Sequence, residues 1–196
     1  MFDARTFDER YYHRFYHSER HHARAVAAAA RTADLIHGMA RHYGVPVRRI
    51  VDLGAGTGNL LRALGKRFPR AKTVGVELSS YAAARYGWVE SSLVDFDDAT
   101  GFDLVVCNDV IQYLDDAAAA RALERLAVLC RGMLYFTGLT AVDVRETCDP
   151  DASDLRGHFR SGEWYRQRLA PAFVDVGSGV HLLAEAGVPV WELERR

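Results

Sequence analysis

Short apolar runs alternate with amphipathic stretches over most of the chain. Runs of strand length lie at 50–53, 73–77, 88–93, 102–107 and 132–137. Between them, residues 57–67, 79–86 and 117–129 carry apolar positions at helical spacing. Because strands that alternate with helices form parallel sheets covered on both faces, the pattern predicts an open α/β sheet wound on both sides.

The two ends of the chain depart from this alternation. Residues 1–18 mix aromatic rings with charges and predict an arm that packs onto the rest of the molecule, and a long helix is expected over 19–43. At the other end, residues 173–183 and 188–193 have strand character and are separated by the turn-forming residues 185–187. This pattern predicts an antiparallel hairpin that completes the sheet.

Composition narrows the classes of partner. The 196 residues are 49% hydrophobic and carry a net charge of −1, which fits one domain over 1–196 and disfavours broad nucleic-acid binding. No apolar run approaches about 18 residues, so no membrane span is expected. The three cysteines, Cys107, Cys130 and Cys148, form no paired motif, so neither a disulfide framework nor a cysteine zinc site is expected. We expect a cytoplasmic protein without a nucleic-acid or membrane partner, and the oligomeric state stays open.

The sequence VDLGAGTGN at 51–59 carries the sharpest chemical signal. Its glycines permit a tight turn after a strand and allow a ligand to approach the backbone closely. The next strand ends in Glu77, where a carboxylate can accept hydrogen bonds from ribose hydroxyls. A dinucleotide motif would place its third glycine at residue 59, but this chain has Asn59 there and a glycine one residue earlier, at Gly58. The combination predicts a nucleoside site that is not a typical dinucleotide site.

From about residue 48 onward, the motif GAGTG and the acidic Glu77 resemble the class I S-adenosylmethionine-dependent methyltransferases. The resemblance implies a Rossmann-like, seven-stranded doubly wound sheet with a C-terminal antiparallel hairpin. It also implies a helical cover at 1–46, a core at 47–196 and a substrate-side insert at 143–169. The implied reaction is displacement of the methyl group of S-adenosylmethionine by an O, N or S acceptor on a small molecule.

The resemblance also implies individual roles. Asp52 and the glycine loop would lie by the methionine part and ribose, Glu77 would hold the ribose hydroxyls, and Leu78 would pack on the adenine. Family members often place an N-terminal tyrosine over the methionine carboxylate. The implied cofactor residues are Tyr12, Tyr16, Asp52, Gly54, Ala55, Gly56, Gly58, Glu77, Leu78, Ser92, Leu93 and Asn108.

The acceptor side is less sharply defined. Its candidates are Tyr113 after the fourth strand and Arg160, Trp164 and Tyr165 in the insert, although the insert could equally be a helix with an aromatic anchor. A general base is needed only if the acceptor must lose a proton, and the candidates are His158 first and Asp109 second. We expect a cavity between these residues and the cofactor, roofed by the N-terminal arm.

Other functions stay open. The same features would suit a non-catalytic protein that senses S-adenosylmethionine. An NAD(P)-dependent oxidoreductase is disfavoured by Asn59 and by the lack of a Tyr-x-x-x-Lys pair. The spacing of His13, His17 and His21 could stack three imidazoles on a helix, but a polar helix face is favoured and no metal is expected.

Overall fold

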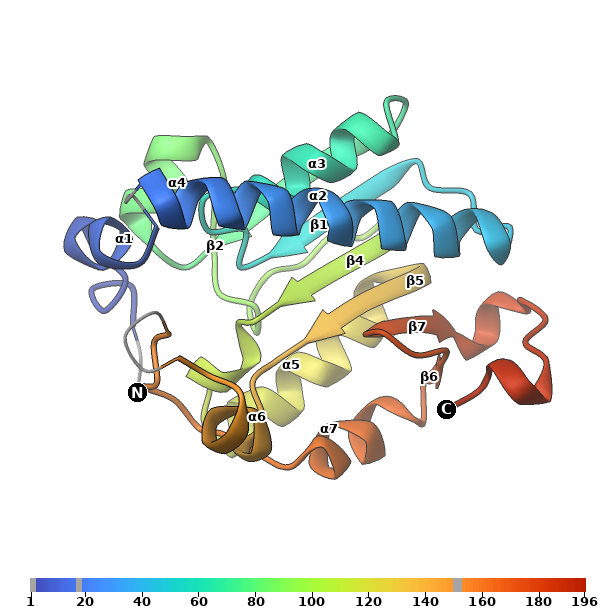
Figure 1. Ribbon diagram of the computed structural model, residues 1–196. Helices are drawn as coiled ribbons and strands as arrows, with labels where there is room; N and C mark the ends of the chain where they lie inside the picture. The colour runs from blue at the N-terminus through green and yellow to red at the C-terminus, as the bar shows by residue number, and fades with distance from the viewer. Residues whose placement is uncertain (1–2, 17–18, 150–152) are drawn as a thin grey trace.

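The computed structural model describes residues 3–16, 19–149 and 153–196, which form a seven-stranded sheet with helices on both faces (Figure 1). The strand order is β3-β2-β1-β4-β5-β7-β6. The strands are β1 (Arg49–Leu53), β2 (Lys72–Glu77), β3 (Val89–Glu90), β4 (Phe102–Asn108), β5 (Cys130–Thr137), β6 (Phe173–Asp175) and β7 (Val180–Leu183). Strands β1 to β5 are parallel, and β7 is antiparallel to β5 and β6.

The α-helices are α1 (Glu9–Tyr16), α2 (Glu19–His42), α3 (Asn59–Arg67), α4 (Ser80–Tyr86), α5 (Asp116–Leu129), α6 (Ala141–Glu146) and α7 (Gly162–Leu169). Three short 3₁₀ helices lie at Ile111–Tyr113, Ala184–Ala186 and Glu192–Glu194. Figure 1 shows α2 and α3 on one side of the sheet and α5 and α7 on the other. No helix in the described ranges is long and apolar enough to cross a membrane.

Side chains that alternate along each central strand build the two halves of the core. On β1, Ile50 packs into the cluster under α2 and α3, whereas Val51 and Leu53 pack into the cluster under α5 and α7. On β4, Leu104 and Val106 face α2 and α3 in the same way. This period of two on a strand covered on both faces explains why these strands are continuous apolar runs in the sequence.

The N-terminal arm forms a third, aromatic cluster against α4. Phe7, Tyr11 and Tyr12 are buried there together with Ala82. The Ser79 hydroxyl donates to the Phe7 carbonyl oxygen at 2.5 Å and accepts from the Ala82 amide at 3.1 Å, so one side chain both begins α4 and anchors the arm. The predicted packing arm is therefore a short helix fixed across the edge of the sheet.

The fold class and the terminal hairpin are confirmed, but two boundaries were wrong. The strand expected over 88–93 spans only Val89–Glu90. The hairpin lies within 173–183, where Gly177 and Gly179 adopt φ values of 89° and 78° and form the turn between β6 and β7. Residues 188–193 form no strand. The glycine pair, which allows the left-handed backbone that most residues avoid, fixed the hairpin's position.

Candidate functional site

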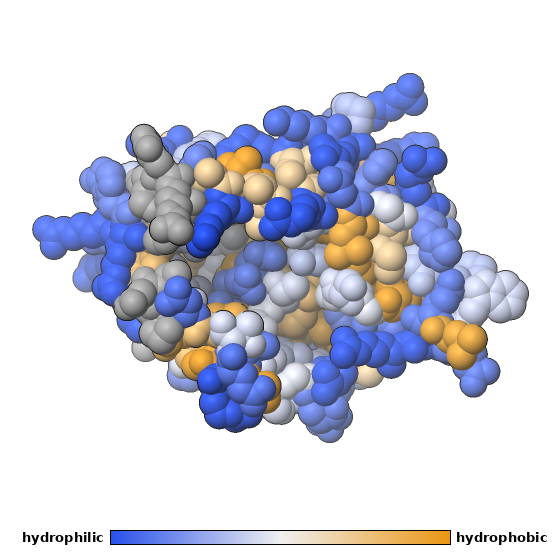
Figure 2. Space-filling model, viewed as in Figure 1, coloured by the Kyte–Doolittle hydropathy of each residue, from blue (hydrophilic) through white to orange (hydrophobic). Residues whose placement is uncertain are grey.

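A cavity of about 580 Å³ opens at the carboxyl ends of the parallel strands. Its floor comes from the segments that follow β1, β2, β4 and β5, and its cover comes from α1 and the first half of α2. In Figure 2 the molecule is hollowed below α2 on the face toward the viewer. This edge of an open α/β sheet is where ligands bind in such folds. We call this cavity the main pocket.

The glycine loop after β1 forms the inner wall of the main pocket. Gly54, Gly56 and Gly58 all have positive φ, at 87°, 51° and 73°. The Gly54 and Ala55 amides donate to the Val76 carbonyl oxygen at 2.8 and 2.9 Å, which ties the loop to β2. A side chain at Gly54 would place its Cβ 2.2 Å from Val110 Cγ2, so glycine is required there by space as well as by conformation.

The Trp88 indole supports the loop from behind. Its Nε1 donates to the Gly56 carbonyl oxygen at 3.0 Å. A Cβ added at Gly58 would lie 2.3 Å from Trp88 Cζ2, and one added at Gly75 would lie 2.4 Å from Trp88 Cε3. The glycines at 58 and 75 therefore admit the indole, which holds the loop in place.

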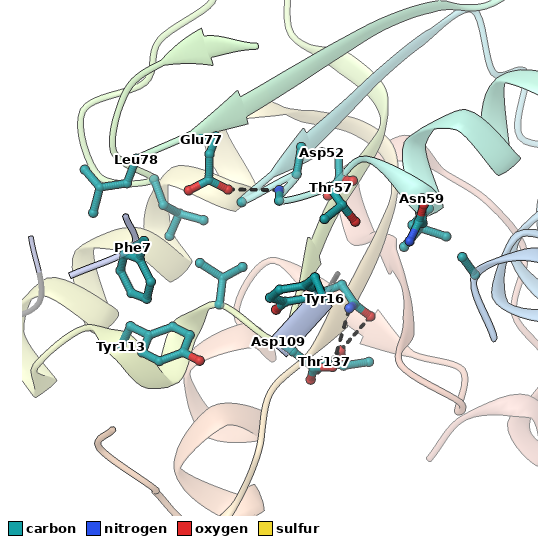
Figure 3. Close-up of a pocket in the computed structure, with 18 of the residues that line it drawn as sticks. Phe7, Tyr16, Asp52, Thr57, Asn59, Glu77, Leu78, Asp109, Tyr113 and Thr137 are labelled. Carbon is teal, nitrogen blue, oxygen red and sulfur yellow. Dashed lines mark hydrogen bonds between the residues drawn. The ribbon is translucent and has the colours of Figure 1, made fainter. Parts of the chain in front are cut away.

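Glu77 points from the end of β2 toward the glycine loop (Figure 3). Its Oε2 accepts from the Gly56 amide at 2.9 Å and its Oε1 accepts from the Ser79 amide at 3.0 Å. Burial raises the pKa of this carboxyl, while these amides and the Tyr12 hydroxyl act in the opposite direction. Each oxygen accepts one of these amide bonds and can accept more, so the carboxylate can bind hydroxyl donors from a ligand.

Asp52 lies near the end of β1 at the base of the main pocket. Burial, followed by the charge of Glu77, raises the pKa of this carboxyl to about 7. A buried carboxyl beside a second carboxyl favours either protonation or a nearby positive charge. A ligand with a cationic group near Asp52 would stabilise the ionised carboxylate, which burial and Glu77 both disfavour.

The opposite wall comes from the ends of β4 and β5. The Thr137 hydroxyl donates to Asn108 Oδ1 at 3.1 Å and lies 3.2 Å from Asp109 Oδ1. Figure 3 shows Thr137 beside Asp109 on this wall. Asp109 has a φ of 55°, which is uncommon for a residue other than glycine. Its carboxyl group is exposed to the hollow of the pocket, and desolvation there raises its pKa.

The far end of the main pocket is more apolar. Leu78, Leu93 and Phe7 line it. The Ser92 hydroxyl, which also lies at this end, donates to Asp95 Oδ2 at 2.6 Å and accepts from the Asp95 amide at 3.1 Å. Ser92 therefore stabilises the turn that begins at its own position.

Tyrosines of the arm close the main pocket from above. Tyr12 and Tyr16 line it, and desolvation raises the pKa of both hydroxyls, so both stay neutral and act as hydrogen-bonding groups. The Tyr11 and Tyr113 hydroxyls are 3.2 Å apart, and Tyr113 donates to Asp154 Oδ2 at 3.3 Å. The arm is thus linked through Tyr113 to the segment after α6.

The structure brings most of the expected cofactor residues together around the main pocket. Those that line it are Tyr12, Tyr16, Asp52, Gly54, Ala55, Gly56, Glu77, Leu78, Ser92, Leu93 and Asn108. Gly58 lies behind the loop, against Trp88. Asp109 and Tyr113, expected on the acceptor side, line the wall opposite Glu77.

Four expected residues of the insert lie elsewhere, which corrects their assignment to the pocket wall. His158 is exposed and does not line the pocket. Tyr165 is buried in the core under α5 and α7, and Trp164 packs against the same core. Arg160 is buried, and its guanidinium donates to Asp116 Oδ1 at 2.8 Å and to the Leu114 carbonyl oxygen at 2.6 Å. These side chains hold the insert to the start of α5 instead of facing a ligand.

The histidine spacing finds no support as a metal site. His17 lies outside the described residues, as does the side chain of His21. His13 is exposed on α1, 3.9 Å from Glu9. Among the residues whose placement the structure gives, no group of three metal-ligating side chains occurs.

Sequence reasoning missed several residues of the site. Thr137 could have been found, because the end of β5 lies beside the end of β4 in a parallel sheet. Trp88 and the residues of α2 that line the pocket, such as Thr32, gave no such signal, because their contacts come from distant segments.

Comparisons with known proteins agree with this site. A family model described as a methyltransferase domain matches residues 51–132. The chain is 31% identical over 146 residues to the trans-aconitate 2-methyltransferase of Azoarcus sp. (strain BH72), covering 62% of this chain and 55% of that protein. It is 36% identical over 111 residues to the malonyl-[acyl-carrier protein] O-methyltransferase of Legionella pneumophila, covering 50% and 39%. The chain thus spans about half the length of the curated relatives it matches first.

Among solved structures, the magnesium protoporphyrin IX methyltransferase of Synechocystis PCC 6803 with bound S-adenosylmethionine has a similar fold. Its TM-score is 0.62 at 17% identity, with 93% of this chain and 96% of that chain covered. The matched family region contains the glycine loop, Glu77 and the Asn108–Asp109 wall. The sequence matches make residues 51–132 similar to a methyltransferase domain, and the strand order and pocket position support the class I S-adenosylmethionine-dependent methyltransferase family.

Proposed function

We propose that this protein is an S-adenosylmethionine-dependent methyltransferase that acts on a small molecule. The observation that carries the proposal is the position of Glu77, which the Gly56 and Ser79 amides orient beside the glycine loop at the carboxyl edge of the sheet. A carboxylate oriented in this way can accept from the two hydroxyls of a ribose. Bound S-adenosylmethionine would supply a methyl group on a positively charged sulfur, which is an already activated leaving group.

The residues of the main pocket fit this cofactor. The cavity of about 580 Å³ lies in the range usual for small-molecule sites, roughly 300–1,000 Å³. Glu77 would hold the ribose, and the apolar end with Leu78 and Leu93 would take the adenine. The buried Asp52 carboxyl, whose pKa is raised to about 7, would gain from a cationic amino group nearby.

The chain's own contribution to the reaction is orientation and exclusion of water. The arm covers the pocket with Tyr12 and Tyr16, and α2 covers it with small side chains, including Ala28 and Thr32. Fixing an acceptor next to an activated methyl group supplies most of the rate in such a transfer. Asp109, on the wall opposite Glu77, would receive a proton from an acceptor that must lose one.

Calorimetric titration with S-adenosylhomocysteine, the product form of the cofactor, tests the proposal. Wild-type protein should bind it, and NAD should give no heat. The Glu77→Gln variant keeps the shape of the side chain but loses charged acceptors, so its affinity should fall at least tenfold, as expected for charge-assisted hydrogen bonds worth about 1.5–3 kcal/mol each.

Glu124→Gln, an exposed change of the same kind on α5, is the matched control and should bind like wild type. Binding of NAD in place of S-adenosylhomocysteine would contradict the proposal. Release of methylated product from S-adenosylmethionine in the presence of an acceptor would then separate an enzyme from a protein that only senses the cofactor.

A further inference from the structure

A second cavity of about 240 Å³ adjoins the main pocket, and we call it the annex. Tyr11, Tyr16, Asp109 and Tyr113 line both cavities, so the annex begins at the wall opposite Glu77. Its remaining lining includes Gln112, Leu139 and Asp154. The volume equals that of about eight water molecules at roughly 30 Å³ each, which is room for a small organic molecule.

The polar atoms without neutralising partners in the annex are hydrogen-bond acceptors. Asp109 contacts the Thr137 hydroxyl and the Asn108 amide, and neither partner carries a positive charge. Gln112 is only 2% exposed, and no donor within the described part of the chain reaches its Oε1. Its Nε2 is already used, because it donates to the Asp109 carbonyl oxygen at 2.9 Å. Gln112 Oε1 is enclosed by protein, so the acceptor that a ligand with N–H or N⁺–H groups would reach is the Asp109 carboxylate.

The second carboxylate of the annex is already neutralised. Asp154 is held by two bonds from Arg156, with Nε at 2.8 Å from Oδ1 and Nη2 at 2.9 Å from Oδ2. The Arg156 guanidinium also lies over the Tyr11 ring, 5.7 Å from its centre. Asp109 is therefore the uncompensated charge of the annex, and the aromatic rings beside it suit a cation on their faces.

Among the side chains that the structure describes, no basic one lines either cavity. Trans-aconitate, the compound in the names of several relatives, is a tricarboxylate. A polyanion placed against Asp109 without an opposing cation would meet repulsion and an uncompensated loss of hydration. The lining thus disfavours the acceptor chemistry in those relatives' names.

We infer that the annex is the acceptor site and that it takes a small amine, held by Asp109 among the tyrosines. This inference rests on the proposed function, since it names the acceptor class of that same site. The bound ammonium first gives one proton to the Asp109 carboxylate, which frees the nitrogen lone pair. The lone pair then forms the new N–CH₃ bond while the S–CH₃ bond breaks and its electron pair stays on sulfur, so that the product is the N-methylammonium and the neutral thioether.

The test is a binding experiment at saturating S-adenosylhomocysteine, read by calorimetry without turnover. The probes are ethanolamine and 2-phenylethylamine, the size-matched alcohol 2-phenylethanol and the carboxylate 3-phenylpropanoate, together with trans-aconitate. At least one amine should bind roughly tenfold or more tightly than the alcohol, as one charge-assisted hydrogen bond allows, and the carboxylates should bind more weakly still.

The decisive variant is Asp109→Asn. Asparagine tolerates the positive φ of this position, so the backbone should be kept. The amine preference should disappear while affinity for S-adenosylhomocysteine stays within about threefold, since asparagine keeps the shape of the side chain. Asp97→Asn, which removes an exposed carboxylate paired with Arg125, is the matched control and should keep the preference.

The outcomes separate the two proposals. If S-adenosylhomocysteine fails to bind wild type, the proposed function fails. If it binds but a carboxylate or trans-aconitate binds best, or no amine is preferred, the acceptor inference is overturned and the proposed function stands. A preference for amines that survives in Asp109→Asn would also overturn the inference.

Discussion

Arg160→Met tests whether the insert is a structural clamp or a wall of the acceptor site. Methionine keeps an unbranched apolar stem and removes the guanidinium donors. In the structure those donors bond Asp116 Oδ1 at 2.8 Å, the Leu114 carbonyl oxygen at 2.6 Å and the His158 carbonyl oxygen at 3.1 Å. The Arg160 guanidinium also lies over the Trp164 ring, 4.7 Å from its centre.

The expected loss follows from how buried each partner is. The Arg160 side chain is 6% exposed, but that of Asp116 is 78% exposed, so the ion pair itself contributes at most about 1 kcal/mol. The two carbonyl acceptors would lose bonds from a charged donor, each worth about 1.5 kcal/mol or somewhat more. We expect the free energy of unfolding to fall by about 3–4 kcal/mol, and the melting temperature to fall by about 10 °C for a chain of this size.

The assay is urea unfolding, followed by calorimetric titration of the folded variant with S-adenosylhomocysteine. Affinity should stay near that of wild type, because Arg160 does not line the pocket. Arg166→Met on the same helix is the control: Arg166 is exposed and pairs with Glu163 at 3.2 Å, so its loss should cost under about 1 kcal/mol. An Arg160→Met protein of unchanged stability that has lost ligand binding would refute this interpretation.

Three further changes have definite expected results. The pKa of Asp52 is about 7 in the folded chain against 3.8 in the unfolded chain, so this carboxyl lowers the free energy of unfolding progressively as the pH rises from 4 to 7. In Asp52→Asn the free energy of unfolding should depend less on pH across this range and should be higher than that of wild type above pH 7. Urea unfolding at a series of pH values measures both effects. In Gly58→Ala the new Cβ would collide with Trp88, so the melting temperature and the affinity for S-adenosylhomocysteine should both fall. Gly87 also has a positive φ, but no atom lies within 4 Å of the Cβ position there, so Gly87→Ala should leave that affinity unchanged. His158→Ala should leave binding unchanged by calorimetry, since His158 is exposed outside the pocket, and a large loss would restore it as a candidate base.

The parts of the site that sequence reasoning could reach are those encoded locally. A buried strand followed by glycines and a helix defines the loop at 54–58, and the end of the next strand defines Glu77. Parallel strands bring both to one edge by necessity. That is why the expected cofactor residues gather around one cavity.

The parts that sequence reasoning missed depend on long-range packing. Three hydrogen-bond acceptors of Arg160 lie 44 to 49 residues earlier in the chain, at Asp116, Ile111 and Leu114. The residue types of the insert therefore suggested a pocket wall, whereas these long-range contacts make Arg160 a structural clamp. The Tyr11 and Tyr113 hydroxyls are in contact although the two residues lie 102 positions apart in the sequence, and a local hydrophobic pattern does not predict such a contact. The hairpin was misplaced because its strands are short and its turn depends on the backbone conformation of two glycines.

A crystal structure of the protein with S-adenosylhomocysteine tests the central claim most directly. We expect the ligand in the main pocket, with its ribose hydroxyls within hydrogen-bond distance, about 2.5–3.0 Å, of the Glu77 carboxylate. Its sulfur should lie toward the wall formed by Asn108 and Asp109, beside the annex. A ligand bound outside the main pocket, or in it with the ribose away from Glu77, would contradict this account.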